Sequence, residues 1–159
     1  MRKLIEFQIL DVNAKHYEID LASLMDNAGR LVANYIIDNY ENNMSVTIVC
    51  GSGNNGGDGY VIADILLKKD FQVNVLSSGL PKSKIAKIAH SRLNCKIYSL
   101  NQLNDFKYNS DILLDCLLGS GIKGEIRQPF DQYISLMNEF PRIISVDVPS
   151  GIGTACSII

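Results

Sequence analysis

The feature that most constrains the fold of this chain is a glycine-rich run, Gly51-Ser-Gly-Asn-Asn-Gly-Gly-Asp-Gly59. The run follows the β-branched segment Val46–Cys50 and precedes apolar residues at helical spacing from Tyr60 to Leu67. A strand, a glycine loop and a helix in this order place backbone N–H groups and a helix N-terminus against an anionic group. The sequence therefore predicts an anion-binding loop at the end of a strand.

The run also contains the G-x-G-x-x-G pattern of dinucleotide-binding folds, but the companion signal is absent. The predicted second strand, Phe71–Leu76, ends in Ser77-Ser78-Gly79, where such folds carry an acidic residue for a ribose hydroxyl. The run also lacks the Gly-Lys-Ser/Thr ending of a P-loop. A nicotinamide-dependent dehydrogenase is therefore disfavoured.

Length and composition narrow the class of protein further. The 159 residues favour one domain with a substantial core, and a net charge of −2 without a basic cluster gives no reason to expect nucleic-acid binding. No apolar stretch approaches the ~20 residues of a membrane span, and the N-terminus does not resemble a signal peptide. We expect a cytoplasmic protein without membrane attachment. The four widely spaced cysteines predict structural packing rather than a metal site or disulfides.

Alternating apolar segments predict a three-layer αβα, Rossmann-like fold. Short strands that alternate with helices favour a mainly parallel sheet covered on both faces, and right-handed crossovers make it doubly wound. The first 40 residues are expected to form helices, the second of them starting at the N-cap Asp20. Strands are predicted near residues 46–50, 71–76, 95–99, 111–116 and 142–148, and helices near 57–69, 82–92, 100–106 and 128–139.

Three polar motifs follow predicted strands. The glycine run with Asp58 follows the first strand, Asp115 opens a segment that extends to Glu125 after the fourth, and Asp147 closes the fifth before Val-Pro-Ser-Gly151. Ligands of open parallel sheets bind beyond the carboxyl ends of the strands, where the strand order switches. Because the first and fourth strands are neighbours in the common order, we expect Asp58, Asp115 and Asp147 to converge.

Each motif also has a structural interpretation that the sequence leaves open. Asp58 could cap the helix after the loop, and Asp147 could be a turn residue. The glycines between positions 119 and 124 could serve only a turn, and Lys123 could be a solvated surface residue. The three motifs taken together favour a functional site.

The oxygen-bearing side chains of these motifs indicate a kind of ligand. Asn55, Asp115 and Ser150 offer hard, weakly charged oxygens, without a nearby His or Cys to favour zinc. One carboxylate with amide, hydroxyl and carbonyl oxygens suits a large monovalent cation better than a tightly held divalent one. Asp147 could then act as a general acid or base, provided that burial makes its carboxyl group harder to ionise.

On these motifs the chain resembles the YjeF N-terminal domain family, whose enzymatic members are NAD(P)H-hydrate epimerases. The resemblance rests on four ordered motifs, Leu24–Gly29, Asn54–Asp58, Asp115 with Gly119–Glu125, and Val146–Gly151. It covers nearly the whole chain and implies one such domain over residues 1–159.

The resemblance implies that the chain interconverts the R and S forms of NADHX and NADPHX, which are nicotinamide cofactors hydrated at C6. A partner dehydratase, fused to the epimerase in some relatives, would then restore the cofactor. It also implies a homodimer and a bound K⁺ held by Asn55, Asp115 and Ser150, and Asp147 is our hypothesis for the catalytic residue. The implied substrate-binding residues are Asn54, Asn55, Gly56, Gly57, Asp58, Gly119, Ser120, Gly121, Ile122, Lys123, Gly124, Glu125 and Asp147.

Two departures from the family pattern qualify this interpretation. Ile152-Gly153-Thr154 stands where members usually have Asp or Asn, and members continue through further strands and a helix, so C-terminal strands are expected to be missing here. The same fold also serves as a dimerising scaffold in an mRNA-decapping factor, which makes a non-catalytic module the alternative. A scaffold has no need of acidic residues at positions 58, 115 and 147, so their presence favours the enzyme.

Overall fold

A computed structural model of the chain describes residues 20–122 and 124–152. The first predicted helix, Lys123 and Cys156 lie outside the described residues. The sheet contains β1 (Ser45–Cys50), β2 (Gln72–Ser77), β3 (Ile97–Ser99), β4 (Ile112–Cys116) and β5 (Ile143–Ser145). The helices are α2 (Leu21–Asn39), α3 (Asn54–Leu67), α4 (Lys84–Arg92), α5 (Leu103–Phe106) and α6 (Phe130–Met137), with short 3₁₀ segments at Leu100–Gln102 and Lys107–Asn109.

The five strands form one parallel sheet in the order β3-β2-β1-β4-β5. The chain moves outward from β1 to β3 on one side and then returns to β4 on the other, so the strand order switches between β1 and β4. The register aligns Cys50 of β1 with both Ser77 and Cys116. The predicted neighbourhood of the first and fourth strands is therefore confirmed.

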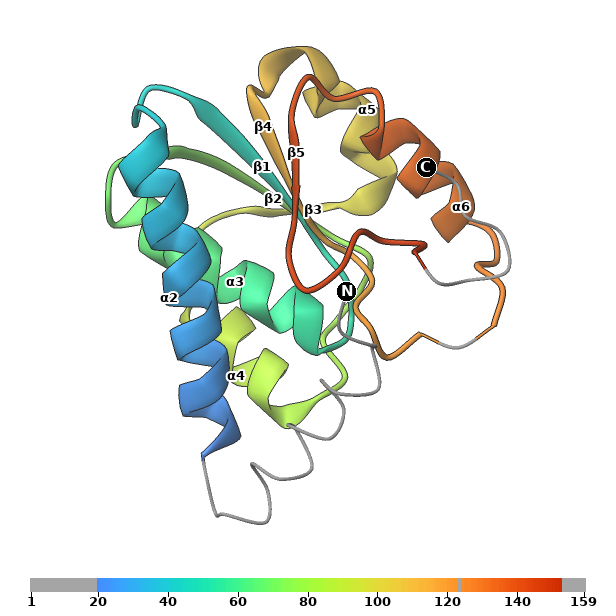
Figure 1. Cartoon of the computed structure of the whole chain (residues 1–159), viewed down its shortest axis with the longest axis horizontal. Coiled ribbons are helices and arrows are strands. Elements are labelled where there is room, and N and C mark those ends of the chain that lie inside the picture. The colour runs from blue at the N-terminus through green and yellow to red at the C-terminus, as the bar shows by residue number, and fades with distance from the viewer. Residues whose placement is uncertain (1–19, 123, 153–159) are drawn as a thin grey trace.

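Helices cover both faces of the sheet, as the sequence predicts for a doubly wound fold. Helices α2, α3 and α4 lie on one face, and α5 and α6 lie on the other (Figure 1). Successive residues of a strand alternate between these two layers, because side chains point to opposite faces with a period of two. In β4, Leu114 and Cys116 pack under α3, whereas Leu113 joins a second cluster with Ile134 and Met137 of α6.

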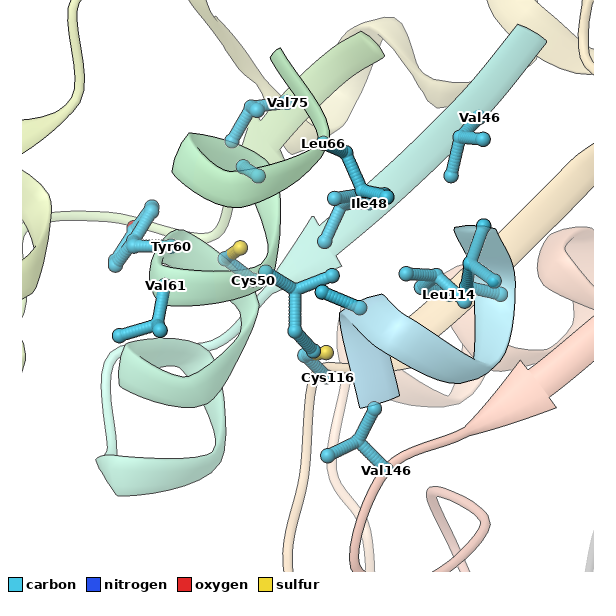
Figure 2. Close-up of a cluster of buried hydrophobic side chains, with 14 of the residues drawn as sticks. Val46, Ile48, Cys50, Tyr60, Val61, Leu66, Val75, Leu114, Cys116 and Val146 are labelled. Carbon is cyan, nitrogen blue, oxygen red and sulfur yellow. The ribbon is translucent and has the colours of Figure 1, made fainter. Parts of the chain in front are cut away.

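Helix α3 lies unusually close to β1 and β4. Figure 2 shows Cys50 and Cys116 side by side beneath this helix, and a Cβ added at Gly59 would lie 2.7 Å from the Cys50 sulfur. Burial raises the pKa of both thiols, so they remain neutral packing groups at ordinary pH. The prediction that these two cysteines are structural agrees with this environment.

The two long helices test the boundary predictions. The N-cap Asp20 is confirmed, because its carboxylate accepts the backbone N–H groups of Ala22 and Ser23. Helix α3, however, begins at Asn54 rather than near residue 57, with Gly53 as N-cap. The interpretation of Asp58 as an N-cap is therefore wrong, because Asp58 lies inside the helix.

The apolar spacing in α2 predicts the helix correctly but not its buried face. Met25, Gly29, Ala33 and Ile36 are buried, and Gly29 allows close contact with Val61 of α3. Leu24, Leu31 and Tyr35 are exposed instead. Small residues at positions 29 and 33 let α3 approach, and this contact decides which face turns inward.

Candidate active site at the carboxyl edge of the sheet

The glycine run forms a tight turn and the first turn of α3. A Cβ at Gly56 would lie only 1.8 Å from the Gly51 carbonyl oxygen, so this backbone contact requires glycine. The N-cap Gly53 supplies no side-chain hydrogen bond to the start of α3. The first backbone N–H groups of the helix, together with its dipole, can therefore bind an anion.

Asn55 is the buried polar side chain of that first turn. Its Nδ2 donates a hydrogen bond of 3.1 Å to the Leu118 carbonyl oxygen, in the segment that follows β4. Its Oδ1 is buried and has no hydrogen-bond partner among the described residues. Because a buried carbonyl without a partner costs free energy, this oxygen marks a position where a ligand or cation fits.

Asp115 is buried within β4 rather than at the end of the strand, and its carboxylate is held by four donors. Ser150 donates from its backbone N–H at 2.7 Å and from its hydroxyl at 2.6 Å. The Leu117 N–H and the Ser145 hydroxyl donate at 3.2 and 3.3 Å. Asp115 thus ties the end of β4 to the loop that follows β5.

Ser150 connects this carboxylate to Leu118. Its Oγ accepts the Leu118 backbone N–H at 2.9 Å and lies 3.3 Å from the Leu118 carbonyl oxygen. That carbonyl is the same oxygen that Asn55 contacts. Three segments far apart in the sequence therefore present amide, hydroxyl, carboxylate and carbonyl oxygens in one place.

Asp147 stands in a different environment, two residues beyond the end of β5. It is exposed, and its φ of 68° places it in the left-handed region. The Val148 N–H donates to the Val146 carbonyl oxygen at 3.0 Å, which makes Asp147 the central residue of a γ-turn. γ-Turns with positive φ are rare and strained, and such strain is concentrated at functional sites. The expectation that burial tunes Asp147 is therefore wrong, and a role for this residue rests on its strained turn and its contacts instead.

A backbone donor fixes the Asp147 carboxylate. The Ser120 N–H donates to Oδ2 at 2.8 Å. A Cβ at the preceding residue, Gly119, would lie 2.8 Å from this same Oδ2 and 3.2 Å from the Asn55 Cβ. Gly119 therefore fits between the α3 segment and Asp147, so the three motifs meet at this position.

The other predicted site residues occupy varied positions. Asn54 is exposed at the helix start, Asp58 is half-buried, and Gly57 packs against Met25 of α2. In the loop after β4, the exposed residues are Gly121, Ile122, Gly124 and Glu125. Of this loop, Gly119 and Ser120 face Asp147, and Lys123 lies outside the described residues.

Sequence reasoning missed two contributors. The Leu118 carbonyl accepts from Asn55, and the Ser145 hydroxyl supports Asp115. A backbone carbonyl leaves no trace in residue type, so Leu118 could not be found. Ser145 carried a weak signal, because it is a polar residue in the apolar strand Ile143-Ile-Ser-Val. Over residues 20–122 and 124–152, the structure places no three His, Cys, Asp or Glu side chains where they could hold a metal ion.

Comparison with known proteins assigns this arrangement to a family. Residues 21–157 match the family model of the YjeF-related protein N-terminus. The chain belongs to this family. Over the described residues, none of the helices is long and apolar enough to cross a membrane.

Members of the YjeF N-terminal family that are similar to this chain include repair enzymes. It is 32% identical to the bifunctional NAD(P)H-hydrate repair enzyme Nnr of Pyrobaculum aerophilum, with 93% of this chain and 32% of that protein covered. It is 35% identical to the NAD(P)H-hydrate epimerase of Elusimicrobium minutum, with coverages of 87% and 69%. The chain thus spans about a third of the length of the bifunctional relative.

A solved structure supports the fold. The crystal structure of yeast ynu0 (YNL200c) superposes with a TM-score of 0.80 at 25% identity. The match covers 94% of this chain and 70% of the yeast chain. The Rossmann-like αβα architecture predicted from the sequence is therefore confirmed.

Proposed function

We propose that this chain is an NAD(P)H-hydrate epimerase domain, an isomerase that interconverts the R and S forms of NADHX and NADPHX. The observation that carries the proposal is the junction at Gly119, where the start of α3 meets Asp147. This junction joins an anion-binding helix terminus to a carboxylate in a strained turn. The names of the relatives described above give the reaction class.

The substrate binds along the edge of the sheet at which the strands have their carboxyl ends. The N–H groups at the start of α3, within Asn54–Asp58, bind the diphosphate of the hydrated dinucleotide. The loop Gly119–Glu125 contacts the nicotinamide half, because Gly119 and Ser120 adjoin Asp147. The C6 carbon of the substrate then lies beside the Asp147 carboxylate.

The chemistry requires a proton acceptor rather than a strong nucleophile. The C6–O bond of the hydrate breaks with assistance from the ring nitrogen, and the departing hydroxide takes a proton from solvent. This leaves a planar C6=N centre. A water adds to the opposite face while the Asp147 carboxylate accepts its proton, and C6 is thereby inverted. Asp147 then releases this proton to solvent, which replaces the proton that the departing hydroxide took. In the reverse direction the same carboxyl group returns the proton.

The oxygen cluster supports a K⁺ site. Asn55 and Ser150 would supply ligands, the Leu118 carbonyl oxygen lies beside both, and Asp115 would supply the negative charge. The unpartnered Asn55 Oδ1 fits such an ion, since a cation would satisfy it. The bound ion would supply positive charge close to the start of α3. The residues themselves hold the glycine run against the loop that follows β5.

We expect two partners for the domain. A dehydratase would use the epimer that the domain produces, and a second copy of the chain would form a homodimer with it. The exposed residues Leu24, Leu31 and Tyr35 of α2 support a second copy of the chain as partner, because they recur at spacings of seven and four. Asn27 and Asn34 flank this stripe, and the charged Asp38 lies only at its C-terminal end. Leu31→Lys should convert the dimer to a monomer in light scattering, and an unchanged mass would exclude this face.

The proposed activity is tested by the rate of R-to-S conversion of NADHX, coupled to a stereospecific dehydratase, with and without K⁺. Conversion above the spontaneous rate supports the epimerase. No acceleration by a folded sample, checked by circular dichroism, would refute it and favour a scaffold module of the same fold.

A further inference from the structure

The carboxyl end of β2 is the part of this edge that the proposed function leaves unused. The strand order places it on the other side of β1 from β4 and β5. Asp147 follows β5, the glycine run follows β1, and Ser78 follows β2. At 4.7–4.9 Å per strand, the ends of β5 and β2 are roughly 14 Å apart. A dinucleotide with its reacting ring at Asp147 and its diphosphate at α3 therefore continues toward β2.

We propose that the β2–α4 loop, residues 78–83, binds the adenosine half of the dinucleotide and selects a 2′-phosphate on its ribose. The inference takes from the proposed function only the class of ligand and its orientation along the sheet edge. NADPHX would then be preferred over NADHX.

Ser77 and Ser78, at the carboxyl end of β2, differ in their hydrogen bonds. The Ser77 hydroxyl is engaged, because it bonds the Tyr60 hydroxyl at 2.9 Å and donates to the Gly79 carbonyl oxygen at 2.7 Å. The Ser78 hydroxyl makes no hydrogen bond to any described residue, while the Ser78 backbone N–H donates to the Cys50 carbonyl oxygen at 3.0 Å. Ser78 thus offers a fixed hydroxyl where dinucleotide folds that prefer an unphosphorylated ribose carry a carboxylate.

The charge of the loop favours an additional phosphate. No acidic residue occurs between Ser77 and Arg92, whereas Lys82 and Lys84 are both exposed at the start of α4. The Lys82 N–H donates to the Ser52 carbonyl oxygen at 2.9 Å, so the loop is fastened to the glycine run. A lysine beside the end of β2 can pair with a 2′-phosphate, which a carboxylate at this position would repel.

An apolar side chain is presented at the same place. Gly79 has a φ of 144°, and its missing Cβ would meet nothing within 4 Å, so the backbone conformation rather than space requires glycine. The residue after Gly79 is Leu80, whose side chain is 81% exposed, and the residue after that, Pro81, is buried. A large exposed apolar side chain beside a ribose site can pack on the face of an adenine ring.

The test is a titration of the full chain with adenosine 2′,5′-bisphosphate and with 5′-AMP, followed by amide NMR spectra at low salt. The bisphosphate should bind at least about 10-fold more tightly than 5′-AMP, as expected for one charge-assisted contact. The perturbed amides should include residues 78–84. Equal affinities, or binding of neither probe, would overturn the proposal.

Variants locate the selectivity. Ser78→Asp and Lys82→Ala should each reduce the 10-fold preference to about 2-fold or less. Lys82→Ala should leave 5′-AMP binding nearly unchanged, whereas Ser78→Asp should strengthen it, because a carboxylate binds an unphosphorylated ribose. Lys69→Ala is the matched control, because Lys69 is exposed before the start of β2, at the opposite edge of the sheet. A preference that survives both loop substitutions, or falls equally in the control, would also overturn the proposal.

The outcome is separable from the epimerase activity. A chain that epimerises both hydrates without any preference for the bisphosphate retains the proposed function and refutes the subsite. A chain that binds the bisphosphate selectively but does not accelerate epimerisation retains the subsite and refutes the function.

Discussion

The two carboxylates near the carboxyl ends of β4 and β5, Asp115 and Asp147, differ in almost every respect. Asp115 is 3% exposed and accepts four hydrogen bonds, two of them from Ser150. Asp147 is exposed, accepts one backbone hydrogen bond from the described residues, that of Ser120, and occupies a strained turn. A carboxylate saturated with donors holds structure in place, whereas one with a free oxygen face can exchange protons. The comparison therefore indicates that Asp115 holds the segments of the site together and that Asp147 takes part in the proton transfer.

The largest effect that this comparison predicts belongs to Asp147→Asn. Asparagine tolerates the left-handed backbone conformation and keeps an oxygen for the Ser120 N–H, but it cannot accept a proton. Epimerisation should fall by about 10²–10⁴-fold, the usual contribution of a general base, with the melting temperature nearly unchanged. Coupled epimerase kinetics and calorimetry measure the two quantities. Asp38→Asn, at an exposed position of α2, is the control, and wild-type activity in Asp147→Asn would exclude the assignment.

Asp115→Asn should act mainly on stability. The new amide group would turn a donor toward the N–H and hydroxyl donors of Ser150, leaving buried groups unpaired. The free energy of unfolding should fall by about 2–4 kcal/mol, which denaturant titration can measure. Combining this change with Ser150→Ala should cost less than the sum of the single effects, since both remove the same bonds. Additive effects would show that the two residues do not act as a unit.

Alkaline pH should destabilise the packing of α3 on β1 and β4, where Cys50 and Cys116 are buried. Burial is the main cause that raises the pKa of Cys50 and Cys116 above 9.0, the ordinary thiol value. Because the folded pKa values are the higher ones, their stabilisation is complete below pH 9 and is lost as pH rises above it. The loss approaches about 1.4 kcal/mol per pH unit for each thiol. Thermal unfolding of Cys50→Ala between pH 8 and 10 should therefore show a shallower decline than the wild type; an identical decline would contradict the buried environment.

The smallest expected effect concerns the unpartnered oxygen of Asn55. If it binds K⁺, potassium chloride should raise stability by about 1.4 kcal/mol at ten times the dissociation constant, or about 3–5 °C in melting temperature. Sodium and choline chloride at equal ionic strength are the controls. Asn55→Leu should abolish the difference between the salts. A wild-type chain that melts at one temperature in all three salts would remove the cation from the proposal.

Much of the fold could be predicted from the sequence, because β1 and β4 are largely apolar runs and the glycine run separates a strand from a helix. The start of α3 could not. The helix predicted near residue 57 begins at Asn54 instead, so Gly56 lies in its first turn, where the Gly51 carbonyl oxygen comes too close for any side chain. Such tertiary contacts override local propensity.

The candidate site was predictable at the level of its residues but not of its environments. The positions of Asp115 and Asp147 after apolar strands showed that both belong to one sheet edge. Burial of the first and exposure of the second depend on strand length, since β5 ends at Ser145 and leaves Asp147 in a turn. The pairing of β5 with β4 determines where β5 ends, and residue type alone does not reveal this end.

The donor that fixes Asp147 belongs to the main chain of Ser120, and this has an evolutionary consequence. Substitutions at position 120 keep this hydrogen-bond donor, because every residue except proline retains the backbone N–H. The neighbouring position is more restricted, since a Cβ at Gly119 would lie 2.8 Å from the Asp147 Oδ2 and would displace the carboxylate from the Ser120 N–H. Related sequences should therefore vary at the residue that makes the bond and stay constant at the residue that makes none.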